Sequence, residues 1–335
     1  MSADGGTKAV VAALFANLGI AVTKFIAFGL SGSSSMLAEA IHSVADSGNQ
    51  VLLLVGGRRA NRRATAQHPF GYGRERYIYA FIVAVVLFVV GGLFALYEAY
   101  HKLSHPEPIE SWPWVPVVVL VVAIGLETMS FRTAIVEANK VRGDLGWVAF
   151  VRRARVPELP VILLEDLAAL VGLILALFGV SLTLLTHNGI WDGVGTAAIG
   201  VLLIAVAVIL AIEMKSLLIG ESATDEQAAA IERAIVAGPE IERVLHMRTV
   251  HLGPEELLVA AKIEVNLEES AGNVINGINA AEARIRSAVP IARVIYLEPD
   301  VYRAAVATVD PSSTDEPGSD APDATGSADA VTSGQ

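Results

Sequence analysis

The chain contains no cysteine. Disulfides, thiolate metal sites and cysteine nucleophiles are therefore excluded, so any transition-metal site must be built from imidazole and carboxylate groups. Charged residues are also scarce: they make up 18% of the 335 residues, whereas 53% are hydrophobic and the mean hydropathy is +0.55. Because soluble globular proteins carry more charge and less apolar surface, most of this chain is expected to lie in lipid.

The net charge of −11 is unevenly distributed along the chain. The last stretch, residues 304–335, has no Lys or Arg and holds Asp310, Asp315, Glu316, Asp320, Asp323 and Asp329. This composition predicts a disordered acidic tail. No basic patch indicates a nucleic-acid partner. The apolar stretch after the short polar segment Met1 to Lys8 is too long for a cleavable signal peptide, so we interpret it as a membrane-spanning helix.

Six segments are long and apolar enough to cross a bilayer, which takes about 20 residues of helix. They are Val10 to Leu30, Ser35 to Gly57, Tyr77 to Tyr100, Trp112 to Ile135, Leu159 to Leu185 and Trp191 to Ile212. Trp112 and Trp191 each begin a segment, where an indole ring suits the headgroup layer. The sequence therefore predicts an all-α, six-helix transmembrane bundle over residues 1–219.

Basic residues alternate between the loops. The loop after the second segment holds Arg58, Arg59, Arg62, Arg63, Arg74 and Arg76, and the loop after the fourth holds Lys140, Arg142, Arg152, Arg153 and Arg155. In the alternate loops, the stretches Gly32 to Ser34, Leu103 to Ser111 and Thr186 to Ile190 contain no Lys or Arg. By the positive-inside rule both termini are expected in the cytoplasm. The predicted location is the cell (plasma) membrane, crossed several times.

A soluble pattern begins after the sixth segment and predicts a separate domain over residues 220–303. We expect a helix at Ala223 to Ala237, strands at Ile241 to Leu252 and Glu256 to Leu267, a helix at Ala271 to Ala288 and a strand at Arg293 to Glu298. This αββαβ order is typical of a small, ferredoxin-like α+β domain. It is expected to lie in the cytoplasm beside the basic loops.

The second predicted segment, Ser35 to Gly57 (helix 2), carries the residues that most clearly indicate a chemical function. Glu39, His42, Asp46 and Asn49 are spaced by three, four and three residues, so they share one helical face. An imidazole and a carboxylate one turn apart form half of a site for Zn²⁺ or a similar divalent ion. The structural alternative is a buried His-Asp hydrogen bond that holds two helices together. Ionisable groups in a membrane helix usually mark an ion or proton path, which favours the metal site.

The fifth predicted segment, Leu159 to Leu185 (helix 5), supplies the adjacent carboxylates Glu165 and Asp166. Neighbouring helical positions differ by about 100°, so only one of them can point straight at helix 2. We expect Asp166 to be the ligand and Glu165 to be a further ligand or proton carrier, or else the partner of an Arg. Lys24 on helix 1 is able to neutralise a carboxylate, and Glu127 on helix 4 fits either a proton path or interhelical hydrogen bonding.

The run from Gly32 through His42 to Asp46 resembles the helix 2 signature of the cation diffusion facilitators. The segment His68-Pro69-Phe70-Gly71-Tyr72-Gly73, the six predicted spans and the αββαβ region extend the resemblance to about Asp300. Glu127-Thr128 and the run around Glu165-Asp166 are similar to the zinc transporter 9 branch. The resemblance implies a homodimeric, proton-coupled antiporter that exports Zn²⁺, with the metal and protons as substrates and no further cofactor. It also implies that His42, Asp46 and Asp166 bind the ion.

One position departs from the family pattern. Most members have His or Asp four residues before the helix 5 Asp, where this chain has Ile162. The fourth ligand would then be Glu165, Asn17, Asn49, water or nothing, and an open site tolerates several metals, so Mn²⁺, Fe²⁺ and Co²⁺ remain alternatives to Zn²⁺. Two other classes are a non-transporting partner subunit and an intramembrane metalloenzyme. The enzyme is disfavoured because no His-Glu-x-x-His pair or intramembrane Ser nucleophile is present.

The cytoplasmic domain and the His68 loop carry fewer candidate ligands. Lys262 and Tyr296 stand near positions where metal-sensing relatives often place His, so no metal is expected there. His246 and His251 are five residues apart on one strand and should face opposite sides. His68 is either a cytoplasmic metal ligand or a turn residue hydrogen-bonded to backbone.

Overall fold

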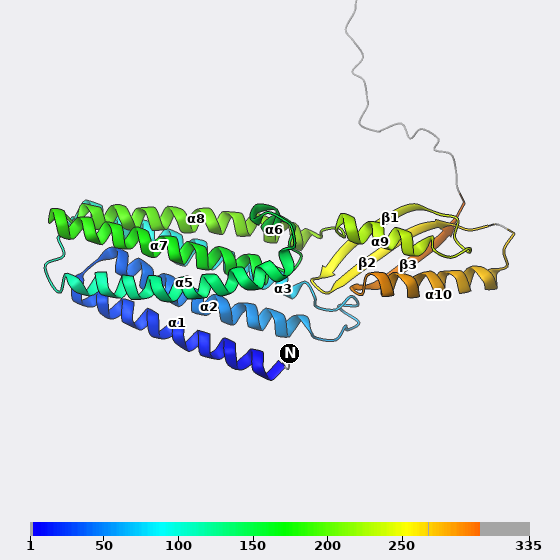
Figure 1. Cartoon of the computed structure of the whole chain (residues 1–335), viewed down its shortest axis with the longest axis horizontal. Helices are drawn as coiled ribbons and strands as arrows, with labels where there is room; N and C mark the ends of the chain where they lie inside the picture. Colours follow the sequence, from blue (N-terminus) through cyan, green and yellow to red (C-terminus); the bar gives the residue numbers. More distant parts are fainter. Residues whose placement is uncertain (1–2, 267, 302–335) are drawn as a thin grey trace, which may run out of the picture.

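The computed structural model describes residues 3–266 and 268–301, with side chains placed from Asn17 onward. A bundle of long helices and a small sheet domain lie end to end, and the last spanning helix leads directly into the sheet domain (Figure 1). The acidic tail predicted at 304–335 lies outside the described residues.

The bundle consists of long helices joined by short loops. They are α1 (Ala3–Ser31), α2 (Ser34–Ala60), α3 (Glu75–Val86) with its continuation through the π-helical η1 (Leu87–Leu93) into α4 (Phe94–Ser104), α5 (Trp114–Arg142), α7 (Glu158–Thr186) and α8 (Ile190–Ile219). The short α6 (Trp147–Arg153) lies in the α5–α7 connection. All six predicted segments are thus helical, whereas the π-helical turn and α6 were not predicted.

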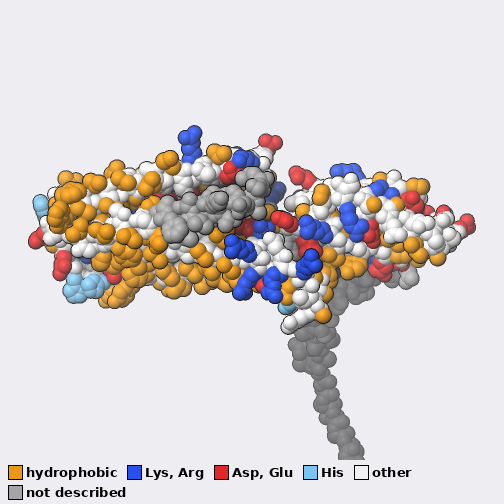
Figure 2. Space-filling view, turned by 90° about the horizontal axis from the view of Figure 1, so that it is seen from below, with side chains coloured by type: hydrophobic (Ala, Val, Ile, Leu, Met, Phe, Trp, Pro, Cys, Tyr) orange, Lys and Arg blue, Asp and Glu red, His pale blue; other side chains and the backbone are white. Residues whose placement is uncertain are grey.

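Four of these helices, within the described part of the chain, are long and apolar enough to span a membrane: α3 to α4 as one unit, α5, α7 and α8. The chain is therefore a multi-pass membrane protein. Length and hydropathy do not select α1, whose described apolar part is the shorter Asn17–Ser31, or α2. Helix α2 has a basic last turn and carries the polar stripe, defined as Glu39, His42, Asp46 and Asn49. Apolar side chains cover the bundle, and Lys and Arg gather where it meets the sheet domain (Figure 2).

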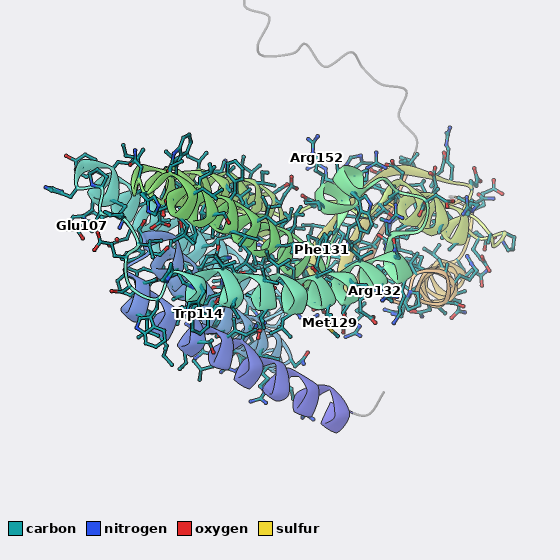
Figure 3. The ribbon with its side chains drawn as sticks, turned by 60° about the vertical axis from the view of Figure 1, so that its left-hand side comes forward. Glu107, Trp114, Met129, Phe131, Arg132 and Arg152 are labelled. Atoms are coloured by element: carbon teal, nitrogen blue, oxygen red, sulfur yellow. The ribbon has the colours of Figure 1, made fainter. Side chains whose placement is uncertain are left out.

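Helix α5 shows how the outer surface is built. It begins at Trp114 and not at Trp112 as predicted, because Pro113 is the N-cap and Trp112 has a positive φ of 51°. Trp114 lies near one end of the bundle and Met129 further along the same helix (Figure 3). Met129 is 69% exposed, and an apolar side chain this open on a spanning helix is expected to face lipid.

Small residues allow α7 and α8 to cross closely. Gly172, Ala176 and Gly179 of α7 are all buried. A Cβ at Gly179 would lie 2.9 Å from the Trp191 carbonyl oxygen and 3.2 Å from the Gly195 Cα of α8. The backbones therefore pack at a distance that only small residues permit, as is common between membrane helices.

The first turn of α2 is bound to α8 by a buried carboxylate. Ser33 is the N-cap, and its hydroxyl donates to Asp192 Oδ1 at 2.9 Å. The Ser34 backbone N–H donates to Asp192 Oδ2 at 2.7 Å, and the Ser35 N–H donates to Oδ1 at 3.3 Å. Asp192 thus satisfies N–H groups that a helix N-terminus leaves unpaired, and its negative charge suits the helix dipole there.

The C-terminal domain has the predicted αββαβ order: α9 (Asp225–Ile235), β1 (Arg243–Gly253), β2 (Glu256–Glu264), α10 (Ala271–Ala288) and β3 (Ala292–Asp300). The sheet order is β1-β2-β3, with β1 antiparallel and β3 parallel to β2. The parallel pair needs a crossover, which α10 provides. Both helices pack against the sheet through a separate apolar core that includes Ile231, Ile285 and Val259.

Lys262 and the two histidines of this domain lie in different surroundings. The Lys262 ammonium contacts Glu298 and Asp300 at 3.1 Å each, and these carboxylates raise its pKa. His246 is exposed and His251 buried, so they do face opposite sides, and burial lowers the pKa of His251.

The His68 loop is held by backbone contacts. Thr65 and His68 exchange backbone hydrogen bonds of 3.1 Å, so the turn is present, and a metal ligand at the His68 ring stays a prediction. Nearby, Arg155 forms an ion pair with Glu221, and the Glu221 carbonyl accepts the His251 N–H at 2.9 Å. These contacts connect the α5–α7 connection to the sheet domain.

We predict that Asp192→Ala destabilises the bundle. The substitution leaves buried N–H and hydroxyl donors of the α2 N-terminus unpaired, which should cost roughly 2–4 kcal/mol. The measurement is the melting temperature of the detergent-solubilised chain, with the exposed Asp144→Ala as a matched control. Equal melting temperatures for the two variants would show that Asp192 does not hold α2.

Candidate metal-binding site

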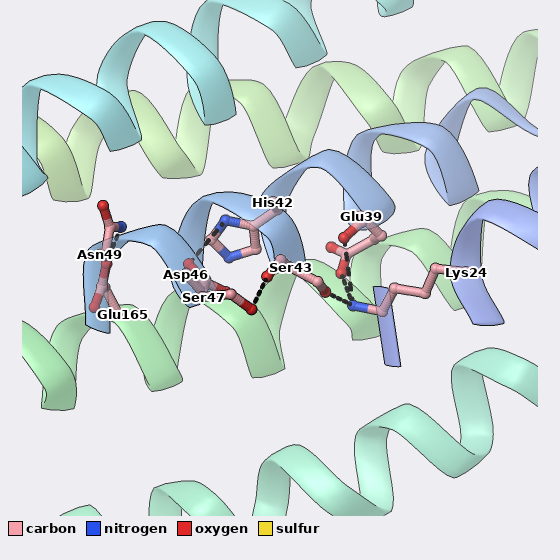
Figure 4. A network of polar contacts seen from close by, with 8 residues as sticks. All are labelled: Lys24, Glu39, His42, Ser43, Asp46, Ser47, Asn49 and Glu165. Atoms are coloured by element: carbon pink, nitrogen blue, oxygen red, sulfur yellow. Dashed lines mark hydrogen bonds and ion pairs between the residues drawn. The ribbon is translucent and has the colours of Figure 1, made fainter. Parts of the chain in front are cut away.

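The polar stripe of α2 is buried inside the bundle (Figure 4). His42 is 1% exposed, and its Nδ1 lies 3.5 Å from Asp46 Oδ1. Neither ring nitrogen of His42 has a hydrogen-bond partner within the described part of the chain, and the same holds for Asp46 Oδ1. Both residues belong to α2, so their contact does not join two helices. Buried polar atoms without partners are rare in proteins, and here they mark lone pairs that an ion could use.

The carboxylates of α7 point in two directions, as their adjacent positions require. Glu165 faces α2, where its Oε1 accepts a hydrogen bond of 2.5 Å from the Asn49 amide. Asp166 faces α5, where its Oδ2 accepts a hydrogen bond of 3.0 Å from the Ser130 hydroxyl. In this conformation Glu165, and not Asp166, is therefore the α7 residue bonded to the α2 stripe. Its partner is an amide and not an Arg.

A cavity of about 500 Å³ lies between the polar residues of α2 and the carboxylates of α7. Four helices contribute polar side chains to its wall: Asn17, Asp46, Gln50, Glu127, Ser130, Glu165 and Asp166. Ile162 lies among them as an apolar member. The cavity continues to Arg58, Asn61, Arg76 and Glu158, near the basic loops and the sheet domain. Asp46, Glu165 and Asp166 thus border one cavity that reaches this end of the bundle, whereas His42 does not line it.

The ligands are not drawn together around one point. No group of three His, Asp or Glu side chains is close enough to hold a metal anywhere in residues 3–266 and 268–301. The His42–Asp46 pair and Asp166 instead occupy separate parts of the same region. Five carboxylates line the cavity wall. Glu158 is paired with Arg76, and the other four, Asp46, Glu127, Glu165 and Asp166, repel one another when charged and gain most from an incoming cation.

A buried ion pair lies at the other end of the stripe. Lys24 Nζ contacts Glu39 Oε2 at 3.0 Å and donates to the Ser43 hydroxyl at 2.8 Å. The other oxygen of Glu39 has no hydrogen-bond partner and lies against Gly172, where an added Cβ would be only 2.8 Å away. Glu39 therefore lies where α1, α2 and α7 meet.

Three residues that line the cavity or hold α2 in place were not predicted from the sequence. Ser130 follows Glu127 by three residues and Gln50 follows Asp46 by four, so helical spacing gave a signal for both. Asp192 had no such signal, because its partners lie about 160 residues away in the chain. The predicted Asn17 does line the cavity, whereas Asn49 uses its amide group on Glu165.

Comparison with known proteins identifies the family of the chain. Residues 10–219 match the model of the cation efflux transmembrane domain. The chain therefore belongs to the cation efflux family, the cation diffusion facilitators, as its helix 2 signature indicated.

The chain is also similar to individual members. It is 30% identical over 269 residues to the proton-coupled zinc antiporter SLC30A9, mitochondrial, of Xenopus laevis, covering 79% of this chain and 47% of the relative. The Homo sapiens protein of the same name is 31% identical over 265 residues, covering 78% and 46%. Metal tolerance protein C4 of Arabidopsis thaliana is 28% identical over 261 residues, covering 77% and 57%. The chain thus spans about half the length of these relatives.

The sheet domain matches small solved structures. A MamM C-terminal domain is 17% identical, with a TM-score of 0.22, and the match covers 23% of this chain and 93% of that one.

We predict that a thiol at position 162 is accessible to water although it lies on a spanning helix. Because the chain has no cysteine, Ile162→Cys creates a single reactive site. Thiols react as thiolates, which form far more readily in water than in lipid. A cationic, membrane-impermeant thiol reagent added from the side of the basic loops should label Ile162→Cys faster than Phe178→Cys, whose side chain is 64% exposed on the same helix but lines no part of this cavity. Similar labelling rates would contradict an aqueous cavity.

Proposed function

We propose that this protein exports a divalent metal ion, Zn²⁺ by preference, in exchange for protons. The observation that carries the proposal is one cavity lined by Asp46, Glu127, Glu165 and Asp166, with the unpartnered His42 ring directly behind Asp46. Buried ionisable groups that line a cavity inside a membrane bundle typically mark an ion or proton path. The names of the similar antiporters support Zn²⁺ and proton coupling.

In the proposed ion-bound state, His42, Asp46 and Asp166 coordinate the metal. A small approach of α7 toward α2 would bring Asp166 to the His42–Asp46 pair, because all three already border the same region. Glu165 is a further ligand once it leaves Asn49, and Asn17 or Glu127 could fill the position that Ile162 leaves open. The set holds one imidazole and several oxygens, which also suits Mn²⁺, Fe²⁺ and Co²⁺.

Proton exchange follows from the chemistry of these ligands. Imidazole and carboxylate groups bind a metal only after they lose their protons, so metal binding releases protons. Metal uptake on one side of the membrane and protonation on the other then couple two opposing fluxes. The cavity opens beside the basic loops, which are the proposed cytoplasmic side, so the described conformation would receive the ion from the cytoplasm.

The proposed protein has six spans, with α1 and α2 added to the four that hydropathy alone supports. The polarity of α2 is expected of a helix that lines an ion path. Residues 1–219 form the transport domain and 220–303 a ferredoxin-like domain that pairs two copies in the cytoplasm. The charge asymmetry gives the orientation of the chain, and the plasma membrane is the proposed location. The similar antiporters are named mitochondrial, and fractionation of the two membranes would decide.

A non-transporting partner subunit is the second candidate, because Ile162 cannot coordinate a metal. Such a subunit would keep the fold but carry no flux on its own. Flux through the purified protein in the absence of any other chain would exclude it.

We predict that Asp46→Ala and Asp166→Ala each lower the rate of Zn²⁺ flux in proteoliposomes by at least about 100-fold, since each removes a charged ligand from a site with few others. Flux should also rise with an opposing pH gradient. The assay includes a panel of Zn²⁺, Mn²⁺, Fe²⁺ and Co²⁺.

The matched control is Glu137→Ala, which removes an exposed carboxylate of α5 that is paired with Lys140 outside the cavity. It should transport as the wild type does. Normal flux in either aspartate variant would remove that residue from the site, and flux that ignores the pH gradient would contradict proton coupling.

A further inference from the structure

Lys24 is a buried cation inside the bundle. Its side chain is 1% exposed, and the ammonium group contacts Glu39, which is 0% exposed, and the Ser43 hydroxyl. The two charges come from different helices, α1 and α2, and are brought together by the fold (Figure 4). Removing an ammonium and a carboxylate from water costs several kcal/mol per ion, and the pair only partly compensates for this.

Stability does not explain this pair. Replacing a buried ion pair with apolar residues of similar volume is often neutral or stabilising. Here one Glu39 oxygen is also left without a partner, which adds to the cost. A pair that is expensive in lipid and imperfectly satisfied indicates a role in the work of the protein.

The pair lies next to the proposed metal ligands. Glu39 precedes His42 by one helical turn, and Ser43 directly follows His42. Because the bundle interior has a low dielectric constant, neighbouring carboxylates feel the Lys24 charge. Lys24 itself lines no part of the cavity, so it affects an ion in the cavity through its field and through Glu39.

The charge balance shows what Lys24 changes. Six carboxylates surround this region: Asp46, Glu127, Glu158, Glu165 and Asp166 line the cavity, and Glu39 lies outside its wall. Glu158 is paired with Arg76 on the same wall, whereas Lys24 engages one oxygen of Glu39. Without Lys24, Glu39 would be an additional free anion one turn from His42, and the region would hold a cation more strongly.

We infer that Lys24 is a resident counter-cation that holds Glu39 away from the transported ion and keeps the ion's binding loose enough for release. Lys24 is therefore a positioning residue that acts through Glu39. A transport site must bind its ion well enough to load it and weakly enough to let it leave. The inference rests on the proposed function and adds to it the residue that sets the affinity.

The test compares charge-changing variants of the full-length chain. Lys24→Gln should lower the Kd for Zn²⁺ by about tenfold, because a positive charge near the ion is removed. Its maximal flux should fall while its KM also falls. Glu39→Gln leaves Lys24 without its partner and should raise the Kd by a similar factor. Lys24→Arg keeps the charge and should stay close to the wild type.

The double variant Lys24→Gln/Glu39→Gln decides between an electrostatic and a structural role. It removes both charges, so its Kd should return toward the wild-type value. Binding is measured by titration calorimetry in detergent with Zn²⁺ alone, and KM and maximal flux are measured in proteoliposomes. A structural role would instead weaken binding in all three Gln variants, and it would predict no return in the double variant.

The outcomes separate this inference from the proposed function. A wild-type chain that binds Zn²⁺, with a Lys24→Gln variant of equal or weaker affinity, overturns the inference alone. If Lys24→Gln does not fold, Glu39→Gln still tests it, because tighter or unchanged binding in that variant would contradict the Lys24 field. A wild-type chain that binds no divalent ion overturns both.

Discussion

The rest of the structure depends on the cost of placing charge in hydrocarbon. Each buried ionisable group of the bundle must have a partner, contact water or await an ion. Lys24 and Glu39 satisfy most of this need with each other, and Glu165 and Asp166 do so with the polar side chains Asn49 and Ser130. The His42 nitrogens and one Asp46 oxygen do not, and they lie beside the cavity. Buried groups that have hydrogen-bond partners therefore belong to the structural framework, whereas those without partners mark the candidate site. This distinction is sharper than the mere presence of polar residues.

Helix α2 joins the two kinds of group in one rigid element. At its N-terminus, Asp192 binds the backbone and hydroxyl groups of the serine run and fixes the helix to α8. About three turns later, His42 and Asp46 face the interior, and beyond them Gln50 borders the cavity. Helix α7 crosses α8 closely through small residues such as Gly179, so α8 positions both α2 and α7. Hydrogen bonds therefore hold α2 at its N-terminal end, and the cavity lies toward its other end.

Much of this organisation follows from sequence patterns of short range. The helical spacing of Glu39, His42, Asp46 and Asn49 predicted one face, and α10 has the predicted bounds, because caps and periodicity are local properties. The direction of Glu165 against Asp166 was not predictable: the 100° rule says that they diverge, but the rotation of α7 about its axis decides which one meets α2. The expected preference for Asp166 was therefore not what this conformation shows. The π-helical turn in η1 and the Asp192 contacts depend on tertiary packing, which spacing along one helix does not encode.

The substitution at Ile162 acquires a physical meaning from its surroundings. A His at this position would place an imidazole on the cavity wall in addition to the His42 ring behind it, and two imidazoles favour Zn²⁺ over harder ions. With Ile162, the wall offers carboxylate, amide and hydroxyl oxygens and a single imidazole behind them. An oxygen-rich set binds a divalent ion mainly through charge, so its affinity depends on how many carboxylates are free. Under the proposed function, the Lys24–Glu39 pair controls that number, and the loss of a neutral ligand at Ile162 makes such control more important, because fewer directed bonds remain to set the affinity.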